Sequence, residues 1–292
     1  MKNLLILNPS SFKGKALEAK EKVESAFNKY NLDYEIHISK STDDIIEAIR
    51  LNLNSEITNF ISVGGDGTLH YMANALAETR KNLGCIPFGS GNDIAASLNI
   101  LPDLDSCCKA IKKGAVKRID LGLINSKYYY LGVAGAGFDS IVTDLANNTK
   151  FPIKGPAKYT YAVYRTLITY RSKKFFIKFD GNERELDAMF MVVGNLPRYG
   201  GGMQIAPNAD PEDGILDVCI IKRMSKIHLI KAFPSVFKGE HLSDPYVEYF
   251  RVNDFQIDSE YNFSVFADGE YICKLPAKFK VVPKALNFIV QQ

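Results

Sequence analysis

The sequence contains little cysteine and little histidine, the residues that most often form disulfides and bind zinc. Its cysteines are odd in number and none has CxxC spacing: Cys85, Cys107, Cys108, Cys219 and Cys273. This pattern argues against a disulfide framework and against a zinc site, so we expect buried thiols. The four histidines are scattered along the chain, which argues against a histidine metal cluster.

Long apolar runs are also missing. No run approaches the ~18 apolar residues of a membrane-spanning helix, and the segment from Met1 to Pro9 is too short and wrongly flanked for a signal peptide. The 292 residues suffice for two domains of ordinary size, and an apolar fraction of 46% is typical of a folded globular protein. We therefore expect a folded protein that stays in the cytoplasm.

Acidic residues are absent from Leu145 to Phe179. This stretch contains eight basic residues: Lys150, Lys154, Lys158, Arg165, Arg171, Lys173, Lys174 and Lys178. Removing these eight positive charges from the net charge of +3 leaves the rest of the chain at −5. Because tyrosines are interspersed, one interpretation of the segment 150–178 is contact with an anionic bilayer. The alternative is a core helix with solvated bases. No motif indicates a nucleic-acid partner.

Strand-like and helix-like segments alternate in the N-terminal part. Apolar residues recur at helical spacing between the strands, as in Val23, Ala26 and Phe27. The expected strands are Asn3 to Leu7, Tyr34 to Ile38, Phe60 to Val63 and Leu83 to Phe88. This alternation implies a parallel sheet, in which a ligand binds beyond the carboxyl ends of the strands.

The segment Gly64-Gly65-Asp66-Gly67-Thr68 joins the third expected strand to a helix. Its glycines let the backbone turn sharply and let a ligand approach the main chain, and the amides of a helix N-terminus suit a phosphate. Because the Asp66 carboxylate repels a phosphate unless a cation lies between them, the loop suggests a nucleotide with Mg²⁺. The alternative is an ordinary corner in which Asp66 or Thr68 caps the helix.

A second glycine-rich corner, Gly89-Ser90-Gly91-Asn92-Asp93, follows the next expected strand. Consecutive strands in such a sheet often lie side by side, so the two loops can share one ligand. A simple helix cap is the alternative interpretation of Asn92 and Asp93.

The pattern changes near residues 116–123. Beyond them, strand-like runs outnumber helices, and Asp180-Gly181, Asp213-Gly214 and Asp268-Gly269 are turn signals typical of antiparallel sheets. Two helices are expected, at Lys158 to Tyr170 and Lys226 to Phe237. The expected strands are Tyr128 to Val133, Phe175 to Phe179, Ala188 to Val193, Ile215 to Ile221, Phe255 to Ile257, Phe263 to Phe266 and Phe279 to Val282. We therefore predict an α/β domain at 1–122 and a β-rich, antiparallel, sandwich-like domain at 123–283.

The two glycine loops, in this order, resemble the catalytic domain of the diacylglycerol kinase family, which includes bacterial lipid kinases and sphingosine and ceramide kinases. Asn8-Pro9-Ser10 is similar to its first-strand turn, and the segment from Asp213 to Val218 resembles its DGxLDV motif. Asp268-Gly269-Glu270 resembles its late DGE motif. The first motif alone also occurs in NAD kinases. The resemblance covers nearly the whole chain and implies that residues 284–292 return to the first domain.

The resemblance also implies an ATP site with Mg²⁺ as cofactor. The implied ATP-binding residues are Asn8, Pro9, Ser10, Ser39, Gly64, Gly65, Asp66, Gly67, Thr68, Ser90 and Asn92. The sequence departs from the family's usual pattern within this site. His70-Tyr71 stand where the family usually has Asn-Glu, and Ser90 stands where threonine is commoner.

Acidic residues would carry the chemistry and the metals. Asp66 and Asp93 would join a water and carboxylate network around the catalytic Mg²⁺, and Asp268 and Glu270 would supply the acid/base position, with the choice between them open. A structural metal site of some bacterial members would be matched by Asp210, Asp213 and the carbonyl of Ile215.

We therefore expect an ATP-dependent lipid kinase that acts peripherally at the membrane surface on a lipid hydroxyl, with diacylglycerol as the preferred acceptor and phosphatidic acid as the product. The alternatives are a NAD kinase-like enzyme and a non-catalytic nucleotide-binding regulator. Homodimer formation is left open. The acceptor lipid itself is not identified, because acyl recognition depends on pocket shape rather than on a motif.

Overall fold

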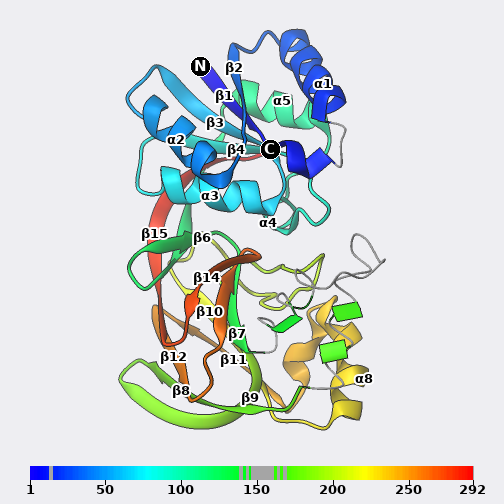
Figure 1. The fold of residues 1–292 in the computed structure, drawn as a ribbon, viewed down its shortest axis with the longest axis vertical. Helices are drawn as coiled ribbons and strands as arrows, with labels where there is room; N and C mark the ends of the chain where they lie inside the picture. The colour runs from blue at the N-terminus through cyan, green and yellow to red at the C-terminus, as the bar shows by residue number, and fades with distance from the viewer. Residues whose placement is uncertain are drawn as a thin grey trace. The chain divides into compact units, whose positions relative to one another are not determined.

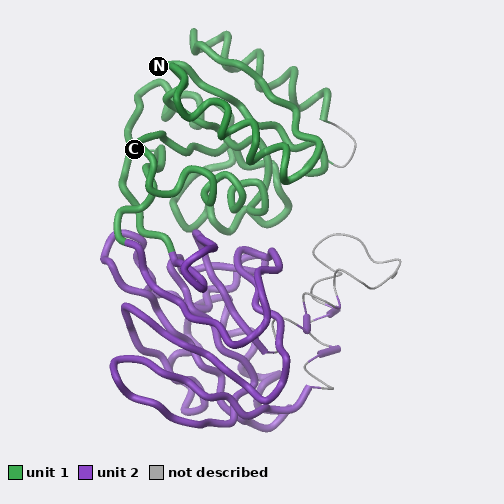
Figure 2. Tube along the Cα trace, turned by 60° about the vertical axis from the view of Figure 1, so that its left-hand side comes forward, with its two compact units in different colours: residues 1–121, 283–292 green, residues 122–282 purple. Residues whose placement is uncertain are grey.

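Figure 1 shows the fold in a computed structural model, which describes residues 1–12, 16–137, 141–142, 145, 161–162, 165–166 and 170–291. The chain divides into unit 1, residues 1–121 with 283–292, and unit 2, residues 122–282 (Figure 2). The sequence pattern predicts the first boundary after residue 122, and the family resemblance implies the second before residue 284. Among the described residues, no helix combines the length and the apolar character needed to cross a membrane.

Unit 1 is built on a parallel sheet with the strand order β2-β1-β3-β4-β15. Nearly every residue of β1, β3 and β4 is buried, as expected for strands of a parallel sheet covered on both faces. The strands are β1 (Lys2–Leu7), β2 (Tyr34–Ile38), β3 (Ile57–Gly64), β4 (Asn82–Pro87) and the end of β15 (Ala277–Ile289).

Among the described helices of unit 1, α1 packs against α5, and α2 and α4 each pack against α3. They are α1 (Ala16–Lys29), α2 (Thr42–Asn52), α3 (Asp66–Leu76), α4 (Asp93–Ser97) and α5 (Leu104–Lys113). Ser41 caps α2: its hydroxyl accepts a hydrogen bond from the Asp44 N–H at 3.2 Å. Apolar residues of α2, such as Ile45 and Ile49, are buried.

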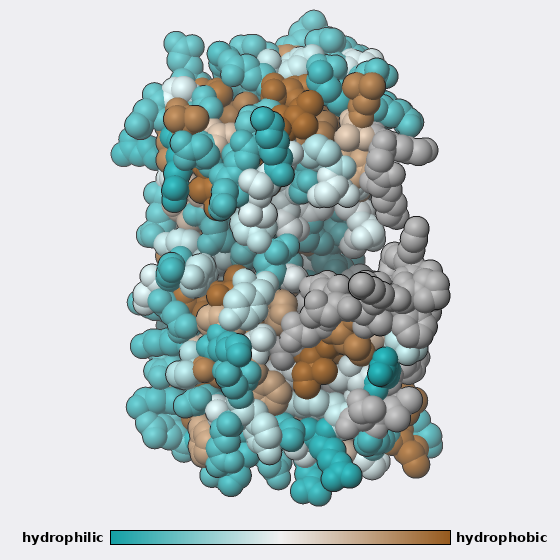
Figure 3. All heavy atoms as spheres, viewed as in Figure 1, coloured by the Kyte–Doolittle hydropathy of each residue, from teal (hydrophilic) through white to brown (hydrophobic). Residues whose placement is uncertain are grey.

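Unit 2 is largely antiparallel. Its strands follow the order β14-β13-β7-β9-β8-β12-β15, and β10 pairs with β9 and β11. A hydrophobic core that includes Val192, Cys219 and Phe255 fills the unit, and hydrophilic residues make up most of the surface seen in Figure 3. β5 (Val116–Ile124) begins in unit 1 and ends in unit 2. The other elements of unit 2 are β6 (Tyr128–Tyr130), β7 (Val133–Gly137), β8 (Lys173–Phe179), β9 (Asn182–Gly194), β10 (Leu216–Lys222), α8 (Lys226–Val236), β11 (Val247–Val252), β12 (Asp254–Ser259), β13 (Ser264–Ala267) and β14 (Glu270–Lys274).

The predicted fold class, an α/β domain followed by a β-rich antiparallel domain, is confirmed. The predicted helix at Lys226 is α8. All five cysteines are free, and all but Cys273 are buried, as expected. The helix predicted at Lys158 to Tyr170 lies mostly outside the described residues.

Three details of the predicted β pattern are wrong. The single strand expected at Tyr128 to Val133 is two strands, because the amides of Leu131 and Gly132 leave the sheet and donate to Asp268. β11 and β14 are missing from the prediction, since their residues are mostly half-buried and lack a clear apolar alternation. β15 is longer than expected and passes through both units.

Candidate active site

The carboxyl ends of β1, β3 and β4 bring three loops together in unit 1. Asn8 follows β1, and its Nδ2 donates to Oγ1 of Thr68, in the first turn of α3, at 3.0 Å. The Asn8 Oδ1 accepts from the Ser10 hydroxyl at 2.6 Å. Phe12 packs on Phe88, with the ring centroids 5.1 Å apart. The first-strand turn is therefore tied to both glycine loops.

The two glycine loops touch each other through their backbones. A Cβ atom built on Gly65 would lie 3.1 Å from the Gly89 Cα, and one built on Gly89 would lie 2.7 Å from the Gly65 Cα. The Phe88 N–H donates to the Gly64 carbonyl at 2.8 Å. Side chains larger than hydrogen do not fit at this contact, which explains Gly65 in the first motif and Gly89 in the second.

Asp66 joins the loops a second time. Its Oδ2 accepts from the Asp93 N–H at 3.0 Å, and its Oδ1 accepts from the Ile94 N–H at 3.2 Å. These amides form the first turn of α4, whose own N-cap residue, Asn92, makes no side-chain cap and has a φ of +57°. Asp66 therefore caps the helix of the neighbouring loop rather than its own helix. The sequence suggested only that Asp66 or Thr68 caps the helix that directly follows them, so it did not predict this contact.

The same edge of the sheet has the features of a nucleotide site. Within the described residues, no side chain caps the N-terminus of α3, which follows Gly65, and such a terminus suits a phosphate. Carboxylate oxygens of Asp66 and Asp93 lie 3.5 and 3.6 Å from the place where a Cβ of Gly91 would stand. Two neighbouring carboxylates are hard oxygen donors of the kind that Mg²⁺ prefers, so these residues fit the predicted cation.

Asn92 belongs to the second loop and is its link to the start of α4. Its Nδ2 donates to the Gly89 carbonyl at 2.9 Å, whereas its buried Oδ1 accepts no hydrogen bond from the described part of the chain. A buried amide oxygen without a donor costs free energy. A donor from a bound ligand would therefore be favourable here. Ser90, at the tip of the loop, is exposed.

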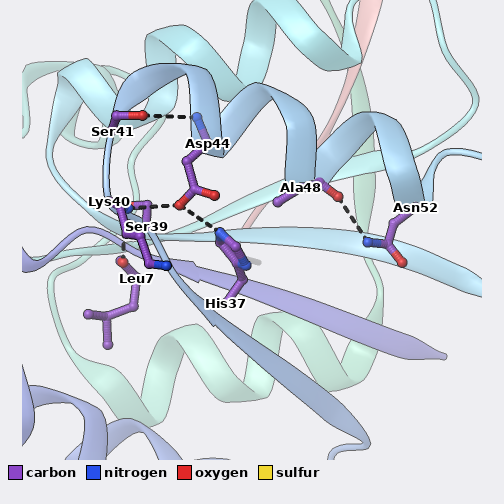
Figure 4. Close-up of polar contacts among 8 residues, drawn as sticks. All are labelled: Leu7, His37, Ser39, Lys40, Ser41, Asp44, Ala48 and Asn52. Atoms are coloured by element: carbon purple, nitrogen blue, oxygen red, sulfur yellow. Dashed lines mark hydrogen bonds and ion pairs between the residues drawn. The ribbon is translucent and has the colours of Figure 1, made fainter.

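The loop after β2 is also fixed at this edge. The N–H and the hydroxyl of buried Ser39 both donate to the Leu7 carbonyl, at 2.9 and 3.3 Å. Beside it, Asp44 accepts from the Lys40 N–H at 2.8 Å and contacts Nε2 of His37 at 3.0 Å (Figure 4). The bonds to Lys40 and His37 lower the pKa of Asp44. The predicted ATP residue Ser39 therefore stands in a rigid loop.

Asp268, an acidic residue of unit 2, is held through both of its carboxylate oxygens. It occupies the turn between β13 and β14 with a φ of +52°. Its Oδ1 accepts from the Gly132 N–H at 2.8 Å, and its Oδ2 accepts from the Leu131 N–H at 2.9 Å. Its own N–H donates to the Val133 carbonyl at 3.0 Å. The turn signal was visible in the sequence, but the two distant amides that hold the carboxylate were not.

Tyr130 is a buried tyrosine that directly precedes the two amides bound to Asp268. Tyr130 is fully buried, and its hydroxyl has no hydrogen-bond partner among the described residues. Burial, and secondarily the charge of Asp268, raises the pKa of Tyr130. Its ring covers Gly122, its cross-strand partner, where a Cβ would come within 2.0 Å of the ring. Gly122 therefore leaves room for the tyrosine that supports this strand.

The residues predicted to bind a structural metal have other partners. The Asp213 carboxylate pairs with Arg251 through Oδ2 and accepts from the Ile215 N–H through Oδ1 at 3.1 Å. The Asp210 Oδ1 accepts from the Glu212 N–H at 3.0 Å. In the described ranges, no group of three or more His, Cys, Asp or Glu residues could hold a metal ion. A metal at Asp210, Asp213 and Ile215 would compete with Arg251 for the Asp213 carboxylate. The metal site stays a prediction.

Two other predicted features take part in packing. His70 is buried, and its ring packs edge-on against Tyr71 at 5.2 Å. In the basic segment, Lys174 and Lys178 lie on β8 and pair with Glu185 and Glu183 of β9. Lys150, Lys154 and Lys158 lie outside the described residues. The membrane contact predicted for this segment stays a prediction.

Comparison with known families agrees with this arrangement. The diacylglycerol kinase catalytic domain matches residues 2–124, and the YegS C-terminal NAD kinase beta sandwich-like domain matches residues 132–290. The crystal structure of a diacylglycerol kinase from Bacillus anthracis strain Sterne superposes with a TM-score of 0.80 at 24% sequence identity, covering 99% of this chain and 96% of that one. These matches define the class, a two-unit protein with a kinase catalytic domain.

Curated relatives extend over the whole chain. The diacylglycerol kinase of Mycobacterium tuberculosis strain H37Rv is 30% identical over 290 residues, which cover 97% of this chain and 93% of the relative. That of Bacillus subtilis strain 168 is 26% identical over 279 residues, covering 94% and 91%. The chain therefore belongs to the diacylglycerol kinase family, and the resemblance seen in its motifs is confirmed.

Proposed function

We propose that this protein is an ATP-dependent lipid kinase that transfers the γ-phosphoryl group of ATP to the hydroxyl of diacylglycerol and forms phosphatidic acid. Its family and the names of its relatives support a kinase that acts on a lipid. The observation that carries the nucleotide part is the pair of hydrogen bonds that the first two amides of α4 donate to the Asp66 carboxylate. This contact holds two glycine loops and two carboxylates at one edge of a parallel sheet.

The loops suit the phosphates of ATP. Gly65 and Gly89 leave the main chain accessible, and the N-terminus of α3 offers amides and the positive end of its dipole. The hydrogen bond between Asn8 and Thr68 ties the first glycine loop to the turn after β1. When bound beside Asp66 and Asp93, Mg²⁺ would neutralise charge on the phosphates. Residues on rigid strand ends hold such groups in place with little reorganisation.

Unit 2 supplies the acid/base candidates. Transfer requires a carboxylate that accepts the proton of the attacking lipid hydroxyl while the bond between the γ-phosphorus and ADP breaks. The backbone amides of Leu131 and Gly132 fix the Asp268 carboxylate, and Glu270 begins the next strand. We assign the proton-accepting role to Asp268, because its position is set on both oxygens. Glu270 is the second candidate.

Identification of the phosphorylated product tests this function. The purified protein is incubated with γ-labelled ATP, Mg²⁺ and diacylglycerol in detergent micelles, with ceramide, sphingosine and NAD in parallel reactions. We expect labelled phosphatidic acid as the main product. Label in NAD with none in lipid would show a NAD kinase-like enzyme instead. ATP binding without any labelled product would show a nucleotide-binding regulator.

A further inference from the structure

The helix α8 presents an apolar and basic face that unit 2 leaves exposed. Figure 1 shows this helix beside the strands of unit 2. Its inner side is anchored: Leu229 belongs to the hydrophobic core, and Phe233 and Val236 pack against that core. On the outer side, Ile227 is 69% exposed and Ile230 is 41% exposed. Single exposed apolar side chains are ordinary, but several on one helix face need an explanation.

The exposed side chains lie on a single stripe. Ile227, Ile230, Pro234 and Phe237 are spaced at i, i+3, i+7 and i+10, which places them on one side of a helix. Phe237 directly follows the helix and is 44% exposed. All four side chains therefore face the surroundings together.

Basic residues surround this stripe, and acidic ones are absent from the segment. From Val218 to Gly239 the sequence contains no Asp or Glu and five basic residues: Lys222, Arg223, Lys226, Lys231 and Lys238. Arg223 lies 3.8 Å from Asp187. Within the described part of the chain, Lys231 and Lys238 have no ion pair. The face thus combines apolar side chains with uncompensated positive charge.

The helix is held firmly at both ends. The Ser225 hydroxyl accepts from the His228 N–H at 3.2 Å and caps the helix. The His228 Nε2 lies 2.6 Å from the Asp244 Oδ2, so the Asp244 carboxylate is paired with the helix. At the other end, the Gln204 Nε2 donates to the Phe237 carbonyl at 3.1 Å. A fixed helix can present its outer face without a folding cost on binding.

We propose that the outer face of α8, formed by Ile227, Ile230, Lys231, Phe237 and Lys238, binds the surface of an anionic lipid bilayer. Helices that lie in the membrane interface bury an apolar stripe among the acyl chains and place lysines against anionic headgroups. Tyr246, which is 41% exposed and packs on the His228 ring, adds a residue type favoured at that interface. The inference rests on the proposed function, because a lipid kinase must reach an acceptor in the membrane.

A single tryptophan provides a direct test. The natural sequence contains none, so Ile230→Trp places a unique fluorophore on the proposed face. Mixing this variant with vesicles of equal parts phosphatidylglycerol and phosphatidylcholine should shift its emission to shorter wavelength, whereas pure phosphatidylcholine should not. Leu51→Trp is the matched control, because Leu51 lies on α2 of unit 1 and is 73% exposed. A shift in both variants, or in neither, would overturn the proposal.

Vesicle sedimentation separates the apolar contribution from the charge. Lys231→Glu with Lys238→Glu should weaken binding to the anionic vesicles at least about 30-fold, from about 1 kcal/mol for each lysine. The double variant Ile227→Ser, Ile230→Ser should weaken it at least about tenfold. The matched controls are Lys112→Glu with Lys113→Glu, and Leu17→Ser with Leu51→Ser, all at exposed positions of unit 1. Unchanged binding in either α8 variant would contradict the proposal.

Kinase activity in detergent micelles keeps the two proposals apart. The α8 variants should phosphorylate micellar diacylglycerol at the wild-type rate, because no bilayer is involved. Normal micellar activity without a fluorescence shift would reject the membrane face alone. A fluorescence shift in a protein that phosphorylates no lipid would reject the proposed function alone.

Discussion

Asp66 caps the helix that starts at Asp93: the Asp93 N–H donates to the Asp66 Oδ2 at 3.0 Å, and the next amide donates to Oδ1. The two loops of the proposed nucleotide site are therefore one structure. A residue in this position has two effects, since it stabilises α4 and it places a negative charge beside the proposed cation.

Replacement of Asp66 should reveal both effects. Asp66→Ala removes the cap of α4 and should lower the free energy of unfolding by about 1 kcal/mol. Turnover should fall by about a hundredfold or more, because the cation loses a neighbouring carboxylate. Urea unfolding and the labelled-ATP assay measure the two quantities.

Asp103 provides the matched control. It caps α5, where its carboxylate accepts from the Ser106 N–H at 2.8 Å, and it belongs to no predicted site. Asp103→Ala should cost a similar free energy of unfolding and leave turnover unchanged. If the two variants lose turnover equally, Asp66 acts through stability alone.

Unit 1 could be predicted in detail because its signals are local. The buried strands, the Ser41 cap and the glycine loops depend on neighbouring residues and on the usual topology of parallel sheets. The sequence could not show that Asp66 binds α4, because this hydrogen bond spans 27 residues. Contacts of this kind depend on how the loops meet after folding.

Unit 2 was harder to predict for the same reason. Asp268-Gly269 and Asp180-Gly181 have the same turn signal and similar positive φ values. The turn signal alone does not distinguish them, but in the fold Asp268 accepts hydrogen bonds from the amides of Leu131 and Gly132, 137 and 136 positions away in sequence. The family motif identified Asp268; its support comes from the structure.

The contact between Gly65 and Gly89 predicts a strong effect of added volume. In Gly89→Ala, the new Cβ would lie 2.6 Å from the Asn92 Oδ1 and 2.7 Å from the Gly65 Cα. Backbone atoms cannot rotate away, so the variant should lose about 1–3 kcal/mol of stability. ATP affinity, measured by calorimetry, should fall at least about tenfold.

Gly91→Ala is the matched control for stability. Its Cβ would meet carboxylate oxygens at 3.5 and 3.6 Å, which are ordinary contacts. The unfolding midpoint should therefore stay close to that of the wild type. Equal destabilisation by the two alanines would show that the loops separate more easily than the close contact implies.

His241 should make stability depend on pH. It is buried, and burial lowers its pKa below the ordinary value of 6.5, although the Ile205 carbonyl and the Asp244 charge act in the opposite direction. The unfolded state then binds the proton more readily. The histidine's contribution is fully present above pH 6.5 and is lost as pH falls through the lower folded pKa.

The variant His241→Gln keeps an N–H donor for the Ile205 carbonyl and cannot titrate. Below pH about 6.5, the wild type should lose up to about 1.4 kcal/mol per pH unit more than the variant. Urea unfolding at several pH values measures the difference. Parallel curves for the two proteins would rule out this role of His241.

Asp268 and Asp180 allow the proposed proton acceptor to be tested at constant backbone geometry. Both precede glycine in a hairpin turn, with φ values of +52° and +48°, and asparagine tolerates this conformation. Asp268→Asn should lower turnover by about a hundredfold or more while ATP affinity stays within about twofold. Asp180→Asn should change neither.

Because Asp268→Asn also loses one of the two hydrogen bonds that its carboxylate accepts from backbone amides, its unfolding curve must be measured beside its rate. Glu270→Gln completes the set: a larger loss in this variant than in Asp268→Asn would transfer the role to Glu270, and full activity in the double variant would remove both residues from the mechanism.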